Sequence, residues 1–240
     1  MEQFLRTELI FGREATKRLS SSHVAVFGIG GVGGYAAEAL ARSGIGTIDL
    51  IDNDIVCITN LNRQIYALHS TIGKYKVDVA EQRIHDICPE IKVNTHKCFF
   101  MPDTSAKFDF SKYDYVIDAI DTVTGKLEII RRAKESGVPV ISAMGAGNKL
   151  DPTAFKVVDI YDTKVCPLAK AMRHELRKMG IKNVKAVYSE EIPVSHANFT
   201  ETEINHTVRR SILGSNAFVP PAAGLIIAGE VIKDIIYERI

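Results

Sequence analysis

The chain has 240 residues, of which 46% are hydrophobic and 25% are charged, a balance typical of a globular protein with a sizeable core. Its formal net charge of +1 excludes a uniformly basic nucleic-acid binder, so such a partner would need a local basic patch. Residues 1–18 lack the apolar core of a secretory signal, and the apolar run at residues 217–229 is too short and too rich in glycine and proline to span a bilayer. We therefore expect a cytoplasmic protein with no integral membrane association.

The cysteines narrow the class of protein further. They stand at Cys57, Cys88, Cys98 and Cys166, with no C-x-x-C pair. This scatter argues against a structural zinc site, and in a chain of this size it also argues against a framework of disulfides.

Strand and helix patterns alternate over the first 150 residues. Strands are predicted at His23–Phe27 and at residues 47–52, 91–95, 115–120 and 140–144, and helices at residues 35–44, 75–88 and 127–136. This alternation predicts a Rossmann-like α/β fold, in which helices cover both faces of a mostly parallel sheet.

The pattern loosens after residue 150. It continues with a strand at residues 155–160, a basic helix at 167–179, a polar segment at 189–215 and an apolar helix at 221–236. The polar residues that interrupt the last helix favour core packing or a dimer interface over a membrane anchor. We interpret residues 1–240 as a single domain, with a core at 1–150 and a C-terminal elaboration at 151–240 for substrate binding and dimerisation.

A glycine-rich turn joins the first predicted strand to the first helix. Its glycines are Gly28, Gly30, Gly31 and Gly33. Glycine permits a tight turn and lets backbone amides approach a phosphate, while the following helix N-terminus supplies partial positive charge. Asp52 ends the next strand, nineteen residues past Gly33, where a carboxylate can accept ribose hydroxyls. A nucleotide site is predicted, but this motif alone does not distinguish NAD from ATP.

The segment after Asp52 favours ATP. It holds polar and cationic residues at Asp54, Asn60, Arg63, Gln64 and Lys76. Hydride transfer needs an apolar slot for nicotinamide, whereas attack at an α-phosphate needs cations that neutralise the transition state and the departing pyrophosphate. Asp121 follows a later strand and is expected to face the same crevice, where its carboxylate can hold Mg²⁺ against a triphosphate. Asp118, three residues earlier, is expected to be structural.

Together these motifs resemble the adenylation domain of the ubiquitin-activating, ThiF-type adenylyltransferases, over roughly residues 6–145. The resemblance implies that Asp52 binds ribose, that Arg63, Gln64 and Lys76 bind the phosphates, and that Asp121 binds magnesium. It also implies that Arg6 enters the active site of a partner subunit, and hence that the protein is a homodimer. Arg6, Arg63, Lys76 and Asp121 are then the catalytic residues.

Sequence features of the second half narrow the resemblance to one branch. Residues 189–215 contain no cysteine, so the thiol relay of some members is missing. The segments 144–153, 167–170 and 188–190 are similar to those of the tRNA threonylcarbamoyladenosine dehydratases, over nearly the whole chain. The resemblance implies that ATP activates the threonine carboxylate on modified adenosine 37 of tRNA, and that a nitrogen of the same side chain then closes a ring and releases AMP. Which ring atom closes the product, and whether Na⁺ or K⁺ binds near residues 145–147, stay open.

A tRNA partner needs a basic surface, and the predicted helix at 167–179 provides one. Lys170, Arg173 and Arg177 recur at helical spacing on one face, with Lys178 beside them. An ordinary solvated helix face is the alternative interpretation.

Three alternative functions are left open. A sulfur-carrier adenylyltransferase is disfavoured by the missing zinc cysteines and by the basic helix. An NAD-dependent oxidoreductase is disfavoured by Arg63 and Lys76, and a non-catalytic nucleotide-binding module by those residues together with Asp121.

Overall fold

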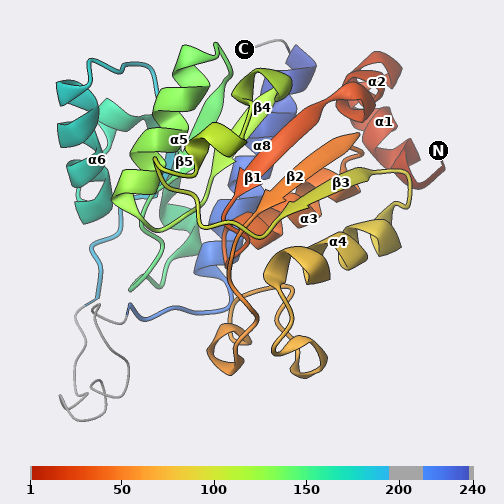
Figure 1. The fold of residues 1–240 in the computed structure, drawn as a ribbon, viewed down its shortest axis with the longest axis horizontal. Coiled ribbons are helices and arrows are strands. Elements are labelled where there is room, and N and C mark those ends of the chain that lie inside the picture. Colours follow the sequence, from red (N-terminus) through yellow and green to blue (C-terminus); the bar gives the residue numbers. More distant parts are fainter. Residues whose placement is uncertain (1, 195–212, 238–240) are drawn as a thin grey trace.

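The structure is a computed structural model that describes residues 2–194 and 213–237. Within these residues seven strands form one sheet in the order β3-β2-β1-β4-β5-β7-β6 (Figure 1). The strands are β1 (His23–Phe27), β2 (Thr47–Ile51), β3 (Lys92–His96), β4 (Tyr115–Asp118), β5 (Val140–Ala143), β6 (Phe155–Asp159) and β7 (Lys185–Ser189). Neighbouring strands are parallel, except that β6 runs antiparallel to β7. The predicted α/β fold with a mostly parallel sheet is confirmed.

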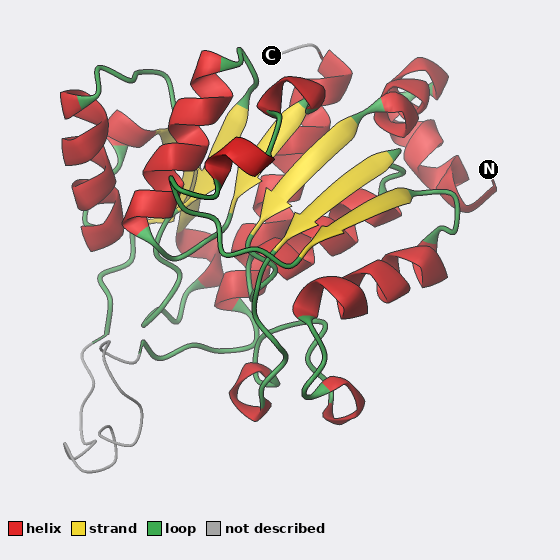
Figure 2. Cartoon of the chain, viewed as in Figure 1, coloured by secondary structure: helices red, strands yellow, loops and turns green. Residues whose placement is uncertain are grey.

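Helices cover both faces of this sheet (Figure 2). Those longer than one turn are α1 (Leu5–Phe11), α2 (Arg13–Ser21), α3 (Gly33–Arg42), α4 (Lys76–Ile87), α5 (Val123–Glu135), α6 (Pro167–Lys178) and α8 (Val219–Tyr237). Because side chains alternate along a strand, Val24 and Val26 of β1 pack with α2, α3, α4 and α8, whereas Ala25 and Phe27 pack with α5 and α6. Two hydrophobic cores result, one on each face.

The last helix is part of the core. Val219, Ile227 and Val231 of α8 are fully buried, and Asp234 of α8 accepts a hydrogen bond from the Tyr115 hydroxyl of β4 at 2.7 Å. Core packing is therefore the role that the described residues give this helix. In the described ranges no helix has the length and apolar character needed to cross a membrane.

The elements differ from the sequence prediction in three places. The short helices α1 and α2 were not predicted. Strand β7 was not predicted either; its residues form a strand by pairing with β5 and β6. Helix α5 starts at Val123 rather than at residue 127. Gly125 lies in its first turn, where the missing side chain admits the Phe100 carbonyl, since an added Cβ would lie 2.9 Å from that oxygen.

The strand order reverses direction between β1 and β4. Strand β1 leads through α3 to β2 on one side, while β4 leads through α5 to β5 on the other. In open α/β sheets such a switch point leaves a crevice at the carboxyl ends of the strands, where ligands bind.

Candidate nucleotide-binding site

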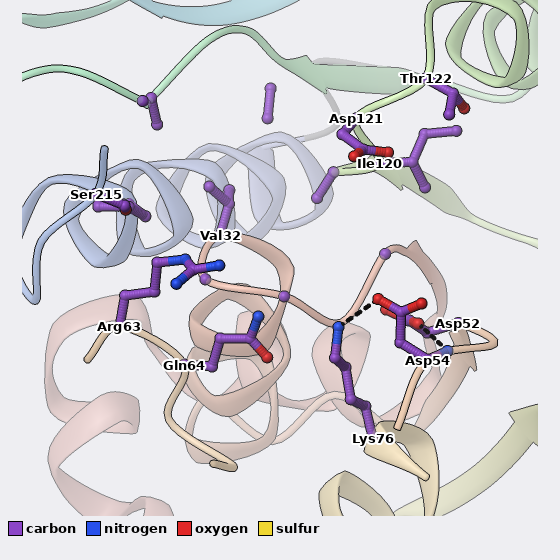
Figure 3. Close-up of a pocket in the computed structure, with 18 of the residues that line it drawn as sticks. Val32, Asp52, Asp54, Arg63, Gln64, Lys76, Ile120, Asp121, Thr122 and Ser215 are labelled. Carbon is purple, nitrogen blue, oxygen red and sulfur yellow. Dashed lines mark hydrogen bonds and ion pairs between the residues drawn. The ribbon is translucent and has the colours of Figure 1, made fainter. Parts of the chain in front are cut away.

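A cavity of about 550 Å³ occupies this crevice. Most of the predicted site residues line it, namely Gly28, Gly30, Gly31, Asp52, Asp54, Asn60, Arg63, Gln64, Lys76 and Asp121. Gly33 is buried at the start of α3 and does not line the cavity. In Figure 3 Arg63, Gln64 and Lys76 lie along one side of the cavity, and Asp121 lies on the opposite wall.

The glycine-rich turn needs glycine because of a positive φ at one position and close backbone contacts at two. Gly28 has a φ of 89°, and a Cβ there would lie 2.7 Å from the carbonyl oxygen of Ala119. At Gly33 a Cβ would lie 1.8 Å from the Gly28 carbonyl oxygen. The turn can therefore close on itself and pack against Ala119, the residue after β4, only with glycine at these positions.

Asp52 ties the glycine-rich turn to the end of β2. Its carboxylate accepts backbone hydrogen bonds from Ile29 at 2.7 Å and from Asp54 at 2.8 Å. Burial raises the pKa of Asp52 above its ordinary value, although Lys76 and the two backbone donors oppose this rise. Further hydroxyl donors, such as those of a ribose, would stabilise the ionised carboxylate.

Contacts within the protein hold the two cations of the site, Lys76 and Arg63, in place. Lys76 is only 5% exposed, and its Nζ lies 2.6 Å from the Asp54 carboxylate. Arg63 donates from Nη1 to the Thr59 carbonyl and to Asn62 Oδ1, both at 2.8 Å. Burial lowers the pKa of Arg63 below its ordinary value, although a guanidinium stays charged at any physiological pH. Partly desolvated cations of this kind interact strongly with phosphate.

The donor set fits magnesium in the way nucleotide enzymes usually hold it. Asp121 is exposed to the cavity from the loop after β4, and no group of three or more His, Cys, Asp or Glu suited to a metal is found among the described residues. Mg²⁺ commonly takes one or two carboxylates and completes its shell with water and phosphate oxygens. The Asp121 carboxylate, exposed at the cavity, meets that requirement.

Residues 213–215 form a wall of the cavity that was not predicted from the sequence. The Asn62 side-chain amide donates to the Ser215 carbonyl at 3.1 Å, and the Gly214 backbone exchanges hydrogen bonds with Asn148. Asn62 also accepts from Arg63, so it links that wall to a phosphate-binding candidate. No local signal marks this contact, because it joins positions 153 residues apart.

Some predicted residues lie outside the cavity. Arg6 is exposed on α1 and does not line the cavity. Helix α1 lies beside the amino end of the sheet (Figure 1). On α6, Lys170, Arg177 and Lys178 are exposed, whereas Arg173 is partly buried and donates to the Thr163 hydroxyl. Asp118 is fully buried and accepts hydrogen bonds from Lys126 at 3.1 Å and from Ser142, in keeping with a structural role.

The fold and the lining of the cavity define an adenylating class of α/β protein, and the comparison with protein families agrees. The ThiF family matches residues 4–238. The chain belongs to the ThiF family.

Individual relatives narrow this class. The chain is 46% identical to the tRNA threonylcarbamoyladenosine dehydratase of Bacillus subtilis, over 99% of this chain and 96% of the relative. It is 32% identical to dehydratase 2 of Saccharomyces cerevisiae, over 80% of this chain and 45% of that protein. The crystal structure of the Escherichia coli dehydratase, TcdA, in complex with ATP is similar with a TM-score of 0.88 and 36% identity, covering 99% of this chain and 95% of the other.

Proposed function

We propose that this chain is an ATP-dependent dehydratase that acts on N6-threonylcarbamoyladenosine at position 37 of tRNA. The observation that carries the adenylation chemistry is the cavity itself, which gathers a glycine-rich turn, two cations and three carboxylates at the switch point of the sheet. The substrate is supported by the names of the relatives, one of which is similar over nearly its entire length. A TcdA crystal structure in complex with AMP, the expected product, is also similar, with a TM-score of 0.88.

In the first step the threonine carboxylate attacks the α-phosphorus of ATP. The bond between the α- and β-phosphates breaks, pyrophosphate leaves and an acyl-adenylate forms. Arg63 and Lys76 neutralise charge on the phosphates, the glycine-rich turn supplies backbone N–H groups, and Asp52 accepts ribose hydroxyls. Mg²⁺ bound at Asp121 would neutralise further charge on the triphosphate.

In the second step an atom of the same threonylcarbamoyl side chain attacks the activated carbonyl carbon. A proton leaves the nucleophile, AMP departs with one former carboxylate oxygen, and a ring closes, so that water is lost overall. This step needs no enzyme nucleophile, because intramolecular reactions reach effective molarities on the order of 10⁵ M or more. The lack of cysteine in residues 189–215 is compatible with this route.

We also propose that the active form is a homodimer in which Arg6 acts on the partner's triphosphate. Arg6 does not line its own cavity, and the same helix exposes two large apolar side chains, with Leu9 at 78% and Ile10 at 77% exposure. Apolar surface of this kind is typical of a contact between proteins. Two-fold pairing is the commonest assembly.

The experiment that tests this function uses tRNA that carries threonylcarbamoyladenosine whose side chain has not cyclised. This tRNA is incubated with the protein and Mg-ATP. We expect a loss of 18 Da, the mass of one water, from the threonylcarbamoyl nucleoside, together with stoichiometric AMP and pyrophosphate. A second assay with a carrier protein in place of tRNA distinguishes the dehydratase from a sulfur-carrier adenylyltransferase. Pyrophosphate exchange that depends on a carrier protein and not on tRNA would favour the sulfur-carrier adenylyltransferase.

A further inference from the structure

A second cavity, of about 360 Å³, lies at the C-terminal end of α6. Its lining, which we call the α6 groove, consists of Tyr161, Arg177, Gly180, Ile181, Lys182 and Asn183. None of these residues lines the nucleotide cavity. The groove therefore has no part in the ATP chemistry described above.

The groove is built around a fixed aromatic ring. Tyr161 lies in the 3₁₀ turn Ile160–Asp162, where its backbone N–H donates to the Asp159 carboxylate at 2.9 Å. Its hydroxyl donates to the Ile181 carbonyl at 2.6 Å. These two hydrogen bonds hold both ends of the residue, and the guanidinium of Arg177 lies over the ring at 5.2 Å from its centroid. A planar cation is thereby supported on a rigid aromatic base.

The positive charge of Arg177 is available to a ligand. In the part of the chain that the structure describes, Arg177 forms no ion pair, whereas its neighbour Lys178 pairs with Glu175 at 2.9 Å. Arg177 and Lys182 are both exposed at the groove. An exposed guanidinium plane with a second cation beside it suits a nucleotide, whose base can stack on the plane while the phosphate meets the cation.

The position of the groove along α6 supports an RNA ligand. Leu168, in the first turn of α6, lines the nucleotide cavity, and Arg177 follows nine residues later on the same helix. At about 1.5 Å and about 100° per residue, Arg177 lies about 14 Å further along the axis and on the opposite side of the helix from Leu168. Stacked nucleotides rise about 3.4 Å each, so an RNA segment that reaches both places must span at least about four nucleotides.

We propose that the α6 groove binds an unpaired nucleotide of the tRNA substrate, a few positions from the adenosine that enters the active site. The base stacks on the guanidinium of Arg177, which Tyr161 supports from below, and Lys182 contacts a phosphate. This assignment rests on the proposed function, because it takes tRNA as the substrate. Recognition of unpaired, stacked bases is the usual way in which proteins read RNA loops.

The test combines protein variants with an anticodon stem-loop that carries the modified adenosine. A series of stem-loops has one base at a time removed, at positions two to five nucleotides from that adenosine. We expect one such removal to weaken binding to the wild-type protein about tenfold, and Arg177→Ala to weaken binding of the intact stem-loop by a similar factor. The removal should then have no further effect on Arg177→Ala. Arg177→Lys, which keeps the charge but loses the plane, should resemble Arg177→Ala.

The control is Lys17→Ala on α2, which removes a charge from an exposed position outside α6, and thermal unfolding checks that each variant folds. The inference is overturned if the two losses multiply, if Arg177→Lys binds like the wild type, or if Arg177→Ala binds no worse than Lys17→Ala. Turnover of full-length tRNA by the wild-type protein is measured in the same series. If that turnover is missing, the proposed function fails; if it is present and the variants are unaffected, only the groove assignment fails.

Discussion

At the scale of single residues, the acidic side chains of the site have different surroundings. Asp52 is held by two backbone donors and by the nearby charge of Lys76, which fixes the position of its carboxylate. Asp121 is exposed on the opposite wall (Figure 3), where the phosphates of a bound triphosphate would bring a metal ion. The two carboxylates should therefore respond differently to substitution.

For Asp121 we predict a catalytic loss without a loss of folding. Asp121→Asn should lower the rate of AMP formation on the order of 100-fold, because charge stabilisation in the transition state is removed, while ATP affinity falls only modestly. Rates are measured over a titration of Mg²⁺, and Asp103→Asn, an exposed carboxylate outside the cavity, is the matched control. Unchanged turnover at saturating Mg²⁺ would remove Asp121 from the mechanism.

A second residue-scale prediction concerns Asp49, buried on β2. Burial alone raises its pKa, but hydrogen bonds from His23, His96 and Asn94 outweigh burial and hold the pKa far below its ordinary value. A carboxyl with a depressed folded-state pKa stabilises the protein above its unfolded pKa of about 3.9, and this stability is lost as the pH falls toward the folded value.

Asp49→Asn should accordingly lower the free energy of unfolding at pH 7 by roughly 2 kcal/mol. Urea unfolding at pH 7, 5, 4 and 3 measures the difference from the wild type, which should shrink below pH 4. A difference that stays constant down to pH 3 would show that the charge of Asp49 contributes nothing.

At the scale of elements, the basic residues on one face of α6 differ in their surroundings. Arg173 is partly buried and fastened to Thr163, so it contributes to packing, whereas Lys170 is exposed. The helical spacing predicted that these residues share a face, but it could not separate them, because the partner of Arg173 lies in the preceding turn.

This difference gives a prediction for α6. Lys170→Glu should weaken tRNA binding and reduce the slope of log affinity against log salt concentration by about 0.7 to 0.9, as one phosphate contact is lost. Arg173→Ala should chiefly lower the unfolding midpoint. Lys17→Glu on α2, an equally large change of charge on another exposed residue, is the control for net charge. If all three variants keep the wild-type salt slope, this face of α6 is only solvated.

The regular elements near the glycine-rich turn could be predicted because their signals are local. Apolar runs mark β1 and β2, glycines mark the turn, and the spacing to Asp52 follows from one βαβ unit. Strand β7 and the wall around Ser215 escaped prediction because long-range pairing creates them, with β5 in one case and with Asn62 in the other. The α6 groove escaped for the same reason, since Tyr161 and Ile181 meet only in the folded chain.

At the scale of the whole molecule, the placement of α1 suggests that one chain does not hold a complete active site. Helix α1, which carries Arg6, lies beside the amino end of the sheet (Figure 1). The residues that line the cavity do not include Arg6. An arginine that acts on phosphate from α1 would have to act in a second subunit.

Mixed dimers test this arrangement. Arg6→Ala and Asp121→Asn should each be nearly inactive alone, but a heterodimer rebuilds one site from the intact Asp121 of one subunit and the intact Arg6 of the other. Equal random mixing gives half heterodimers with one good site in two, hence about a quarter of wild-type activity. A tagged pull-down verifies subunit exchange first. With exchange verified, activity no higher than that of the single variants would rule out action of Arg6 in the partner subunit.

Adenylation of a carboxylate on tRNA in this cavity, followed by ring closure, is tested most directly by mass spectrometry of nucleosides. Threonylcarbamoylated tRNA is incubated with the protein and Mg-ATP, and AMP is quantified in parallel. We expect conversion to a nucleoside lighter by one water, one AMP for each nucleoside converted, and little conversion by Arg63→Ala. AMP formed without any change in the nucleoside, or a dehydrated nucleoside formed equally well without ATP, would rule out this reaction.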